Sequence, residues 1–191
     1  MPIAGIFSTL IGLAVEYTIM SDNIIISAFA GFVAASLFLP LVALGMHHAL
    51  IPIYTVQLET IGYTTLYPAL CMGGCAQVGA AIAIYIIAKR VGNNKLKEVI
   101  KAALVPGILG IGEPLIYGVA LPLFRPFITA GLAAGFGGAF VTAMKCAAVI
   151  WTPAGILGPI AVNAGPLGPG LCVLCYYIGL AISVVLGFVF T

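Results

Sequence analysis

The chain has 191 residues, of which 63% are hydrophobic and only 6% are charged, and its formal net charge is +2 at pH 7. Its mean hydropathy is +1.25, whereas a soluble domain carries about 25% charged residues. These values exclude a soluble enzyme or binding module, and no polar segment is left to form a separate soluble domain. We therefore interpret residues 1–191 as a single all-α integral membrane domain.

Long uncharged stretches predict where the chain crosses the membrane, since a spanning helix needs about 20 apolar residues. Four spans are predicted, at residues 24–46, 66–88, 127–150 and 170–190. A fifth is predicted at 3–20, where Glu16 interrupts the apolar run; this segment is too long and too acidic near its end for a cleaved signal peptide. The expected fold has about five spanning helices joined by re-entrant or discontinuous hairpins.

Basic residues gather in one loop and predict the orientation of the chain. The loop contains five basic residues, Lys89, Arg90, Lys95, Lys97 and Lys101, and one acidic residue, Glu98. The positive-inside rule places the loop at 89–101 in the cytoplasm. The span at 66–88 should then run from outside to inside, and the span at 24–46 from inside to outside. Nucleic-acid binding is the weaker interpretation, because these cations flank a span.

The segment at 47–63 is neither a clean span nor a soluble loop. It contains both histidines of the chain, together with Pro52, Gln57 and Glu59 among apolar residues. We expect it to lie outside the membrane or to dip back into it, so that residues 24–64 form a helix followed by a histidine hairpin.

A second irregular segment, at 102–126, places a lone carboxylate in apolar surroundings. Its eight prolines and glycines predict short helical pieces only, in a discontinuous hairpin. Because proline disfavours the α region for the preceding residue, Glu113 should be extended or in a turn. Irregular backbone at membrane depth persists only when it is sheltered by protein or lines a wet cavity, and a carboxylate there indicates a functional site. A solute-binding site of a transporter is predicted. A third break, at 152–169, predicts an irregular connection or another hairpin.

Two motifs carry a family resemblance. Residues 110–127 read GIGEPLIYGVALPLFRPF, and residues 45–53 read GMHHALIPI. Both resemble the sugar-transporting IIC component of the bacterial phosphotransferase system, glucose superfamily, in the branch of β-glucoside, sucrose and N-acetylmuramate transporters. Two positions depart from the family pattern: Gly112 replaces the usual Thr or Ser, and Leu39 stands where several members carry a polar residue.

The resemblance covers the later, substrate-holding portion of much longer family members, from about residue 24 onward. It implies that the earlier, dimerising portion, or a second copy of the chain, is a partner in the bilayer of the bacterial cytoplasmic membrane. It also implies a phosphorylated IIB protein as partner, because no phosphoryl-carrying residue is identified in this chain. Whether the chain by itself counts as an enzyme stays open.

The resemblance implies that a sugar is transported and phosphorylated by phosphocysteine on IIB. Glu113 would accept hydrogen bonds from sugar hydroxyls, and His47 would orient a hydroxyl or take its proton during transfer. The resemblance implies that five residues contact the substrate: His47, His48, Gly110, Gly112 and Glu113. Three further residues are possible substrate contacts: Gln57, Glu59 and Arg125.

Simpler roles remain open for these residues. The alternative for Glu113 is bonding to backbone amides of the broken helix, and the alternative for either histidine is packing. Arg125 either extends to the membrane interface or meets the phosphoryl group, and Lys145 needs a partner or water. No cofactor is implied. No metal is implied either, since adjacent histidines do not face one another on a helix and no third ligand has a suitable spacing.

At the level of function, two alternatives compete with coupled sugar transport. One is a facilitator with the same fold that releases free sugar inside the cell. The other is a degenerate half-permease that transports nothing.

Overall fold

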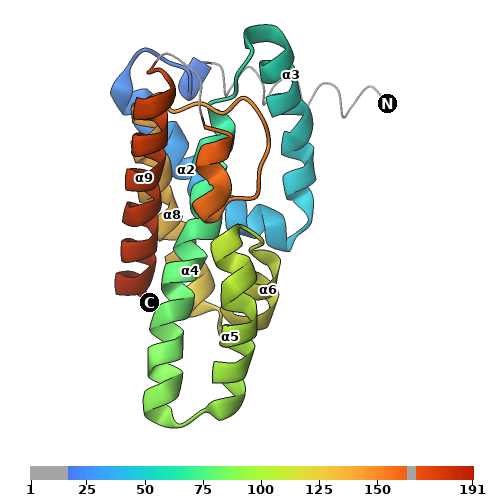
Figure 1. The fold of residues 1–191 in the computed structure, drawn as a ribbon, viewed down its shortest axis with the longest axis vertical. Helices are drawn as coiled ribbons and strands as arrows, with labels where there is room; N and C mark the ends of the chain where they lie inside the picture. The colour runs from blue at the N-terminus through green and yellow to red at the C-terminus, as the bar shows by residue number, and fades with distance from the viewer. Residues whose placement is uncertain (1–16, 163–166) are drawn as a thin grey trace.

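The computed structural model describes residues 17–162 and 167–191. Within these residues the chain is helical, and its only β-type pairing is an isolated bridge between Thr64 and Ala148 (Figure 1). The elements in chain order are α2 (Ile24–Ala43), the 3-10 helix η1 (Met46–Leu50), α3 (Ile51–Ile61), α4 (Leu66–Val91), α5 (Asn94–Leu109), α6 (Glu113–Leu115), the π-helix η2 (Ile116–Ala120), α7 (Leu121–Leu123), α8 (Arg125–Ala143), the 3-10 helix η3 (Gly155–Ile160) and α9 (Pro169–Phe190).

Among the described helices, α2, α4, α8 and α9 are long and apolar enough to cross a membrane. The prediction of an all-helical membrane fold is confirmed. The helices α2, α4 and α9 agree to within three residues with the spans predicted at 24–46, 66–88 and 170–190. The fifth predicted span, at 3–20, lies almost entirely outside the described residues.

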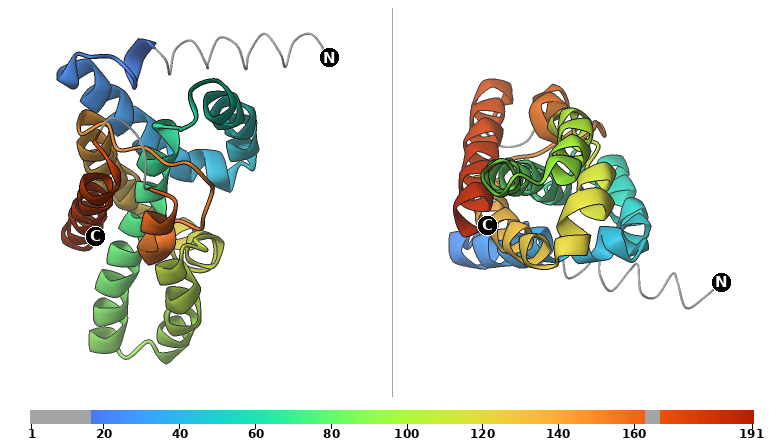
Figure 2. Two further views of the ribbon diagram at one scale, coloured as in Figure 1. Left: turned by 45° about the horizontal axis from the view of Figure 1, so that its top comes forward. Right: turned by 90° about the horizontal axis from the view of Figure 1, so that it is seen from below.

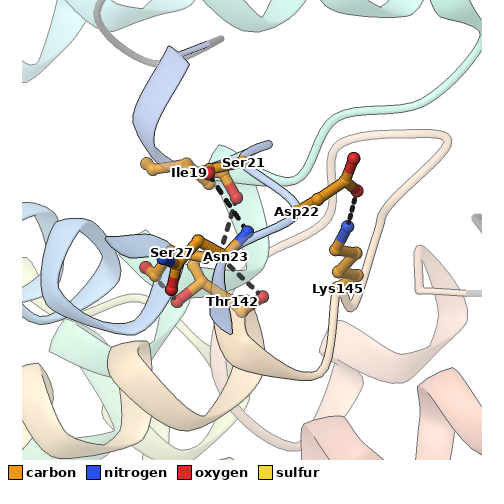
Figure 3. Close-up of polar contacts among 7 residues, drawn as sticks. All are labelled: Ile19, Ser21, Asp22, Asn23, Ser27, Thr142 and Lys145. Carbon is orange, nitrogen blue, oxygen red and sulfur yellow. Dashed lines mark hydrogen bonds and ion pairs between the residues drawn. The ribbon is translucent and has the colours of Figure 1, made fainter. Parts of the chain in front are cut away.

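The span predicted at 127–150 is too long, because α8 ends at Ala143. The chain turns at Lys145, whose φ of 49° lies in the left-handed region and cannot continue a helix. Hydropathy alone does not detect this end, since the residues beyond it remain apolar. Lys145, which had no partner in the sequence, forms an ion pair with Asp22 at 2.7 Å (Figure 3).

The helices α2 and α8 pack closely and run in opposite directions. Near the start of α2, the Ser27 hydroxyl donates to the Thr142 carbonyl oxygen at 3.0 Å, and the Thr142 hydroxyl donates to the Ser27 carbonyl oxygen at 2.9 Å (Figure 3). One turn further on, a Cβ added at Gly31 would lie 2.7 Å from the Gly138 carbonyl oxygen. Small residues of this kind let helix backbones approach each other in a membrane, where packing and polar contacts drive association.

The central helix is α4, which contacts α2, α5, α8 and α9 and is buried over most of its length. Viewed along its axis, it lies in the middle of the bundle (Figure 2). A Cβ at Gly79 would overlap the Val184 carbonyl oxygen, and a Cβ at Gly187 would overlap that of Ala76. These contacts show that α4 and α9 pack at very short separation. The two helices run in the same direction, because Met72 packs with Cys172 and Tyr176 near the start of α9 whereas Gly79 lies against Val184 further along (Figure 1).

The expected direction of α2 relative to α4 is wrong. We predicted that the spans at 24–46 and 66–88 cross the membrane in opposite directions, whereas both helices begin at the same end of the molecule. There, Ile19 packs in one cluster with Leu66 and Leu70. The physical reason is the segment Met46–Ile61: η1 and α3 carry the chain back toward the end at which α2 began (Figure 1).

The segment at 102–126 is only partly broken into short helices. As expected, Glu113–Leu123 consists of two α-helical turns separated by a π-helix. Residues 102–109, however, belong to the continuous helix α5, which passes through Pro106. One missing backbone donor is therefore tolerated within this packed helix, and α5 ends instead at Gly110, whose φ is 103°.

The expectation that Glu113 is extended or in a turn is also wrong. Glu113 is the first residue of α6, and Gly112 before it has φ −82° and ψ −18°, in the α region. Pro114 occupies the first turn of this helix, where its missing N–H is not needed. The side chain of Glu113 is consequently placed by a helix start.

We expect Gly79→Ala to destabilise the bundle, because the new methyl group would displace the backbone of α9 at Val184. Overpacking of this kind costs about 1–3 kcal/mol, which exceeds the gain of about 1 kcal/mol from replacing glycine in a helix. Gly170→Ala is the matched control, since nothing lies within 4 Å of a Cβ at that helical position. Thermal unfolding in detergent measures both variants, and equal midpoints would contradict the close α4–α9 contact.

Candidate functional site

A cavity of about 200 Å³ lies where the two segments predicted to carry the chemistry meet. Its walls come from α2, η1, α3, α4, the turn before α6, and residues 152–154. Most of the lining is apolar, and the groups that can form hydrogen bonds include His47, Gln77, Glu113 and Thr152. An apolar cavity with a few convergent polar groups is the usual form of a small-molecule site.

The position of His47 follows from the turn at the end of α2. Gly45 has a φ of 72°, a conformation that glycine adopts without strain, and it redirects the chain into η1. His47 is half-buried and lies edge-on to Phe38, with ring centroids 6.3 Å apart. Its Nδ1 atom is buried without a hydrogen-bond partner among the described residues. His47 can therefore form a hydrogen bond with a molecule in the cavity.

The electrostatic surroundings of His47 favour its neutral form. Burial lowers the pKa of His47, and the adjacent His48 lowers it further, while the negative charge of Glu113 and the backbone of Leu41 act in the opposite direction. The net shift of the pKa is downward from its usual value of 6.5. A neutral imidazole can accept a proton at neutral pH.

Glu113 lines the same cavity from the start of α6. Its side chain is exposed, and no hydrogen bond or ion pair joins its carboxylate to any of the described residues. The alternative in which Glu113 satisfies backbone amides of the broken helix thus has no hydrogen bond to support it. The carboxylate is free to accept hydrogen bonds from a ligand.

The two glycines before Glu113 have different roles in the wall of the cavity. At Gly110 the backbone is left-handed, and a Cβ would overlap the carbonyl oxygen of Ala154. Gly110 therefore allows the turn before α6 to contact the segment at 152–154. At Gly112 a Cβ would lie 3.2 Å from the side-chain nitrogen of Gln77.

Four predicted candidates lie outside this cavity. His48 and Glu59 are exposed and are absent from its lining. Gln57 is buried, but its amide oxygen accepts a hydrogen bond from the Thr64 hydroxyl at 2.6 Å. Arg125, at the start of α8, lines a separate cavity of about 350 Å³. The structure thus brings His47, Gly110, Gly112 and Glu113 together and leaves these four residues apart.

Two cavity residues, Gln77 and Thr152, were not identified from the sequence. The Gln77 side chain is 3% exposed, and its Oε1 atom has no hydrogen-bond partner among the described residues. The Thr152 hydroxyl is likewise buried without a partner. A signal for Gln77 existed, since it is the only amide, acid or base between Leu66 and Ala88, and polar residues within spans are often functional. Thr152 carried no comparable signal.

The polar groups of the cavity suit a hydroxyl-rich molecule that can both donate and accept hydrogen bonds. The lining includes one carboxylate, one imidazole, one primary amide and the hydroxyl-bearing side chains of Tyr54, Tyr67 and Thr152, which together provide hydrogen-bond donors and acceptors. Within the described residues, no group of three or more His, Cys, Asp or Glu side chains could bind a metal ion. The five cysteines are buried and form no disulfide with one another: Cys71, Cys75, Cys146, Cys172 and Cys175.

The fold and the site together define a membrane protein with a polar cavity between discontinuous segments of its helical bundle. Residues 1–135 match the family model described as "Phosphotransferase system, EIIC", and the chain belongs to this family of membrane permeases. The resemblance seen in residues 45–53 and 110–127 is thereby confirmed.

Curated relatives match along the whole chain. The chain is 43% identical over 191 residues to the "PTS system MurNAc-GlcNAc-specific EIIBC component" of Staphylococcus haemolyticus. It is 41% identical over 192 residues to the protein of the same name from Staphylococcus epidermidis RP62A, and 42% identical over 191 residues to that of Staphylococcus aureus USA300. These alignments cover 100% of this chain but only 37–38% of each relative. No solved structure matches the chain.

Proposed function

We propose that the protein carries a sugar across the bacterial cytoplasmic membrane and presents it for phosphorylation by a separate IIB protein or domain. This proposal rests on the meeting of His47 and Glu113 in one cavity, beside the Gln77 amide oxygen and the Thr152 hydroxyl, which have no hydrogen-bond partner within the described residues. Family membership and the names of the relatives support it. This chain then supplies the substrate-holding part of the permease.

The names of the relatives indicate the class of substrate. Their name gives the disaccharide MurNAc-GlcNAc, which carries both hydroxyl and acetamido groups. The cavity of this chain contains donors and acceptors for both kinds of group. We therefore propose that the substrate is MurNAc-GlcNAc or a closely similar amino sugar.

The roles of the two principal residues follow from their surroundings. The ionised Glu113 accepts hydrogen bonds from sugar hydroxyls, which fixes the sugar by charge-assisted contacts. His47, kept neutral by burial, accepts the proton of the hydroxyl that attacks. In that step an O–P bond forms on the sugar, the S–P bond of phosphocysteine on IIB breaks, and the thiolate leaves. The contribution of this chain is mainly positioning and electrostatics.

The orientation of the protein is also part of the proposal. The α4–α5 hairpin extends beyond the other helices at one end of the molecule (Figure 1). It carries Lys89 and Arg90 in the last turn of α4, and further lysines in α5. The positive-inside rule places this end in the cytoplasm, so IIB docks on the side of the hairpin.

A transport assay tests the proposed coupling. Membrane vesicles carrying the protein, with phosphorylated IIB on the side of the α4–α5 loop, are supplied with labelled MurNAc-GlcNAc. We expect the label to accumulate on the IIB side only as the phosphate ester, and to stay outside when IIB is omitted. Accumulation of free sugar would indicate an uncoupled facilitator. Absence of both products would indicate a half-permease that transports nothing.

We expect Glu113→Gln to lower sugar affinity about a hundredfold or more, because two charge-assisted hydrogen bonds lose their ionised acceptor. Glu59→Gln is the matched control, since it removes the same charge from an exposed position on α3 outside the cavity. Equilibrium binding of labelled sugar to membranes measures both variants, and antibody detection confirms equal insertion. If Glu113→Gln bound sugar as tightly as Glu59→Gln does, Glu113 would not anchor the sugar.

His47→Ala should slow phosphorylation more than it weakens binding. The loss of a proton acceptor lowers the rate about 10²–10⁴-fold, whereas the sugar keeps its contact with Glu113, so we expect its affinity to fall less than about tenfold. His48→Ala is the control, because His48 is exposed and does not line the cavity. Single-turnover transfer from phosphorylated IIB gives the rate, and equal losses of rate and affinity would reduce His47 to a simple ligand.

A further inference from the structure

Gln77 is an amide buried near the middle of α4, the most buried of the described membrane-spanning helices, and its oxygen has no hydrogen-bond partner among the residues that the structure describes. The side-chain nitrogen forms one long hydrogen bond, 3.4 Å, to the Gly73 carbonyl oxygen one turn earlier. That bond leaves one N–H and the whole amide oxygen unused. Buried polar groups are rarely left in this state, since an unmade hydrogen bond is costly in apolar surroundings. Gln77 lines the cavity of His47 and Glu113, where a ligand can complete its bonds.

The other glutamine of the chain shows what a structural amide looks like here. Gln57 is also buried, but its oxygen accepts the Thr64 hydroxyl at 2.6 Å, and its nitrogen lies 3.7 Å from the sulfur of Met20. Both ends of this amide are thus engaged within the protein. Gln57 therefore has a structural role and connects α3 to the start of α4. Gln77 differs, because its amide oxygen and one N–H can form hydrogen bonds with a molecule in the cavity.

Because Gly112 has no side chain, the amide of Gln77 fits against it. The φ of −82° and ψ of −18° at Gly112 are accessible to any residue, so the backbone does not require glycine at this position. The nearest atom to an added Cβ is the Gln77 nitrogen, at 3.2 Å, which is tighter than an ordinary contact. The amide of Gln77 therefore lies beside a residue that has no side chain.

Thr152 provides a second neutral group in the same cavity. Its hydroxyl is buried without a partner in the described part of the chain. The Tyr67 hydroxyl donates to the backbone carbonyl oxygen of Thr152 and fixes this segment to α4. The segment reaches the face of α4 that carries Gln77, because a Cβ at Gly74, one turn before Gln77, would lie 3.3 Å from the Cβ of Ala154. The cavity therefore has a charged side, at Glu113, and neutral groups at Gln77 and Thr152.

We propose that Gln77 is a sugar-binding, specificity-determining residue that recognises the acetamido group of the substrate. The Oε1 atom of Gln77 accepts the N–H of the acetamido group, whose C=O points the opposite way because this amide is trans. The acetamido methyl group packs on the apolar lining of the cavity, a contact that a sugar hydroxyl at the same carbon lacks. The Thr152 hydroxyl adds a further contact to the same sugar. This inference rests on the proposed function, since it assigns a role within the same cavity.

The test compares two labelled sugars on the full-length protein in membranes. One is MurNAc-GlcNAc, and the other is its analogue with hydroxyl groups in place of the acetamido groups. We expect the unsubstituted protein to prefer the acetamido sugar by about tenfold to a hundredfold. In Gln77→Met, which keeps the side-chain length and removes the amide, the preference should fall to within about threefold of unity. Gln57→Met is the matched control and should retain the preference.

A second variant changes the residue that lies beside the Gln77 amide and leaves Gln77 itself in place. Gly112→Ser leaves α4 unchanged but introduces a Cβ 3.2 Å from the Gln77 nitrogen, so we expect it to reduce the preference for the acetamido sugar as well. It also tests the proposal independently if Gln77→Met fails to fold.

The outcomes separate this inference from the proposed function. If the unsubstituted protein binds the acetamido sugar and both Gln77→Met and Gly112→Ser keep its preference, the role of Gln77 is overturned and the transport function stands. If the unsubstituted protein binds neither sugar, the proposed function and the inference fall together. Loss of preference in both variants, with Gln57→Met unchanged, supports the assignment.

Discussion

Backbone polar groups at membrane depth must find partners inside the protein, and the arrangement of this fold depends on that requirement. The chain is irregular after α8, where Ala148 exchanges two backbone hydrogen bonds with Thr64 at 2.8 and 2.9 Å and Val149 donates to Ala161 at 3.0 Å. The turn at Gly110 packs directly on Ala154 of the same irregular segment. Two breaks in the helical pattern thus shelter each other beside α4, and the cavity forms where they meet.

The two principal site residues are placed by separate parts of the bundle. His47 follows α2, which is joined to α8 by the reciprocal Ser27–Thr142 hydrogen bonds, whereas Glu113 follows α5, which packs on α4. The buried Ser27–Thr142 pair contributes more to this placement than the nearby Lys145–Asp22 ion pair, whose acid is fully exposed. The geometry between imidazole and carboxylate consequently depends on how α2 and α5 pack against the central helix.

Much of this arrangement was predictable from the sequence, for identifiable reasons. The uncharged runs indicated the spanning helices, and the glutamate beside proline indicated the cavity, because both signals reflect local chemistry. The direction of α2 was not predictable from hydropathy, since that property does not reveal that Met46–Ile61 returns the chain to its starting end. Pro106 did not end α5, because the packing of this helix outweighed one lost hydrogen bond. Gln77 was not predicted, because a single uncharged amide hardly changes the hydropathy of an apolar helix.

In the proposed function, the distribution of charge in the cavity accounts for how one site can combine binding with selectivity. An exposed carboxylate at Glu113 attracts hydroxyl donors without distinguishing one sugar from another, because nearly every sugar carries them. A neutral amide distinguishes substrates differently, since a ligand that lacks its counterpart leaves a buried polar group unpaired. Gln77 is placed for this role by its burial in α4, by the absent side chain at Gly112 and by the fixed backbone at Thr152. If these proposed roles hold, affinity and specificity depend on different groups of the same cavity, so a substitution can change one without loss of the other.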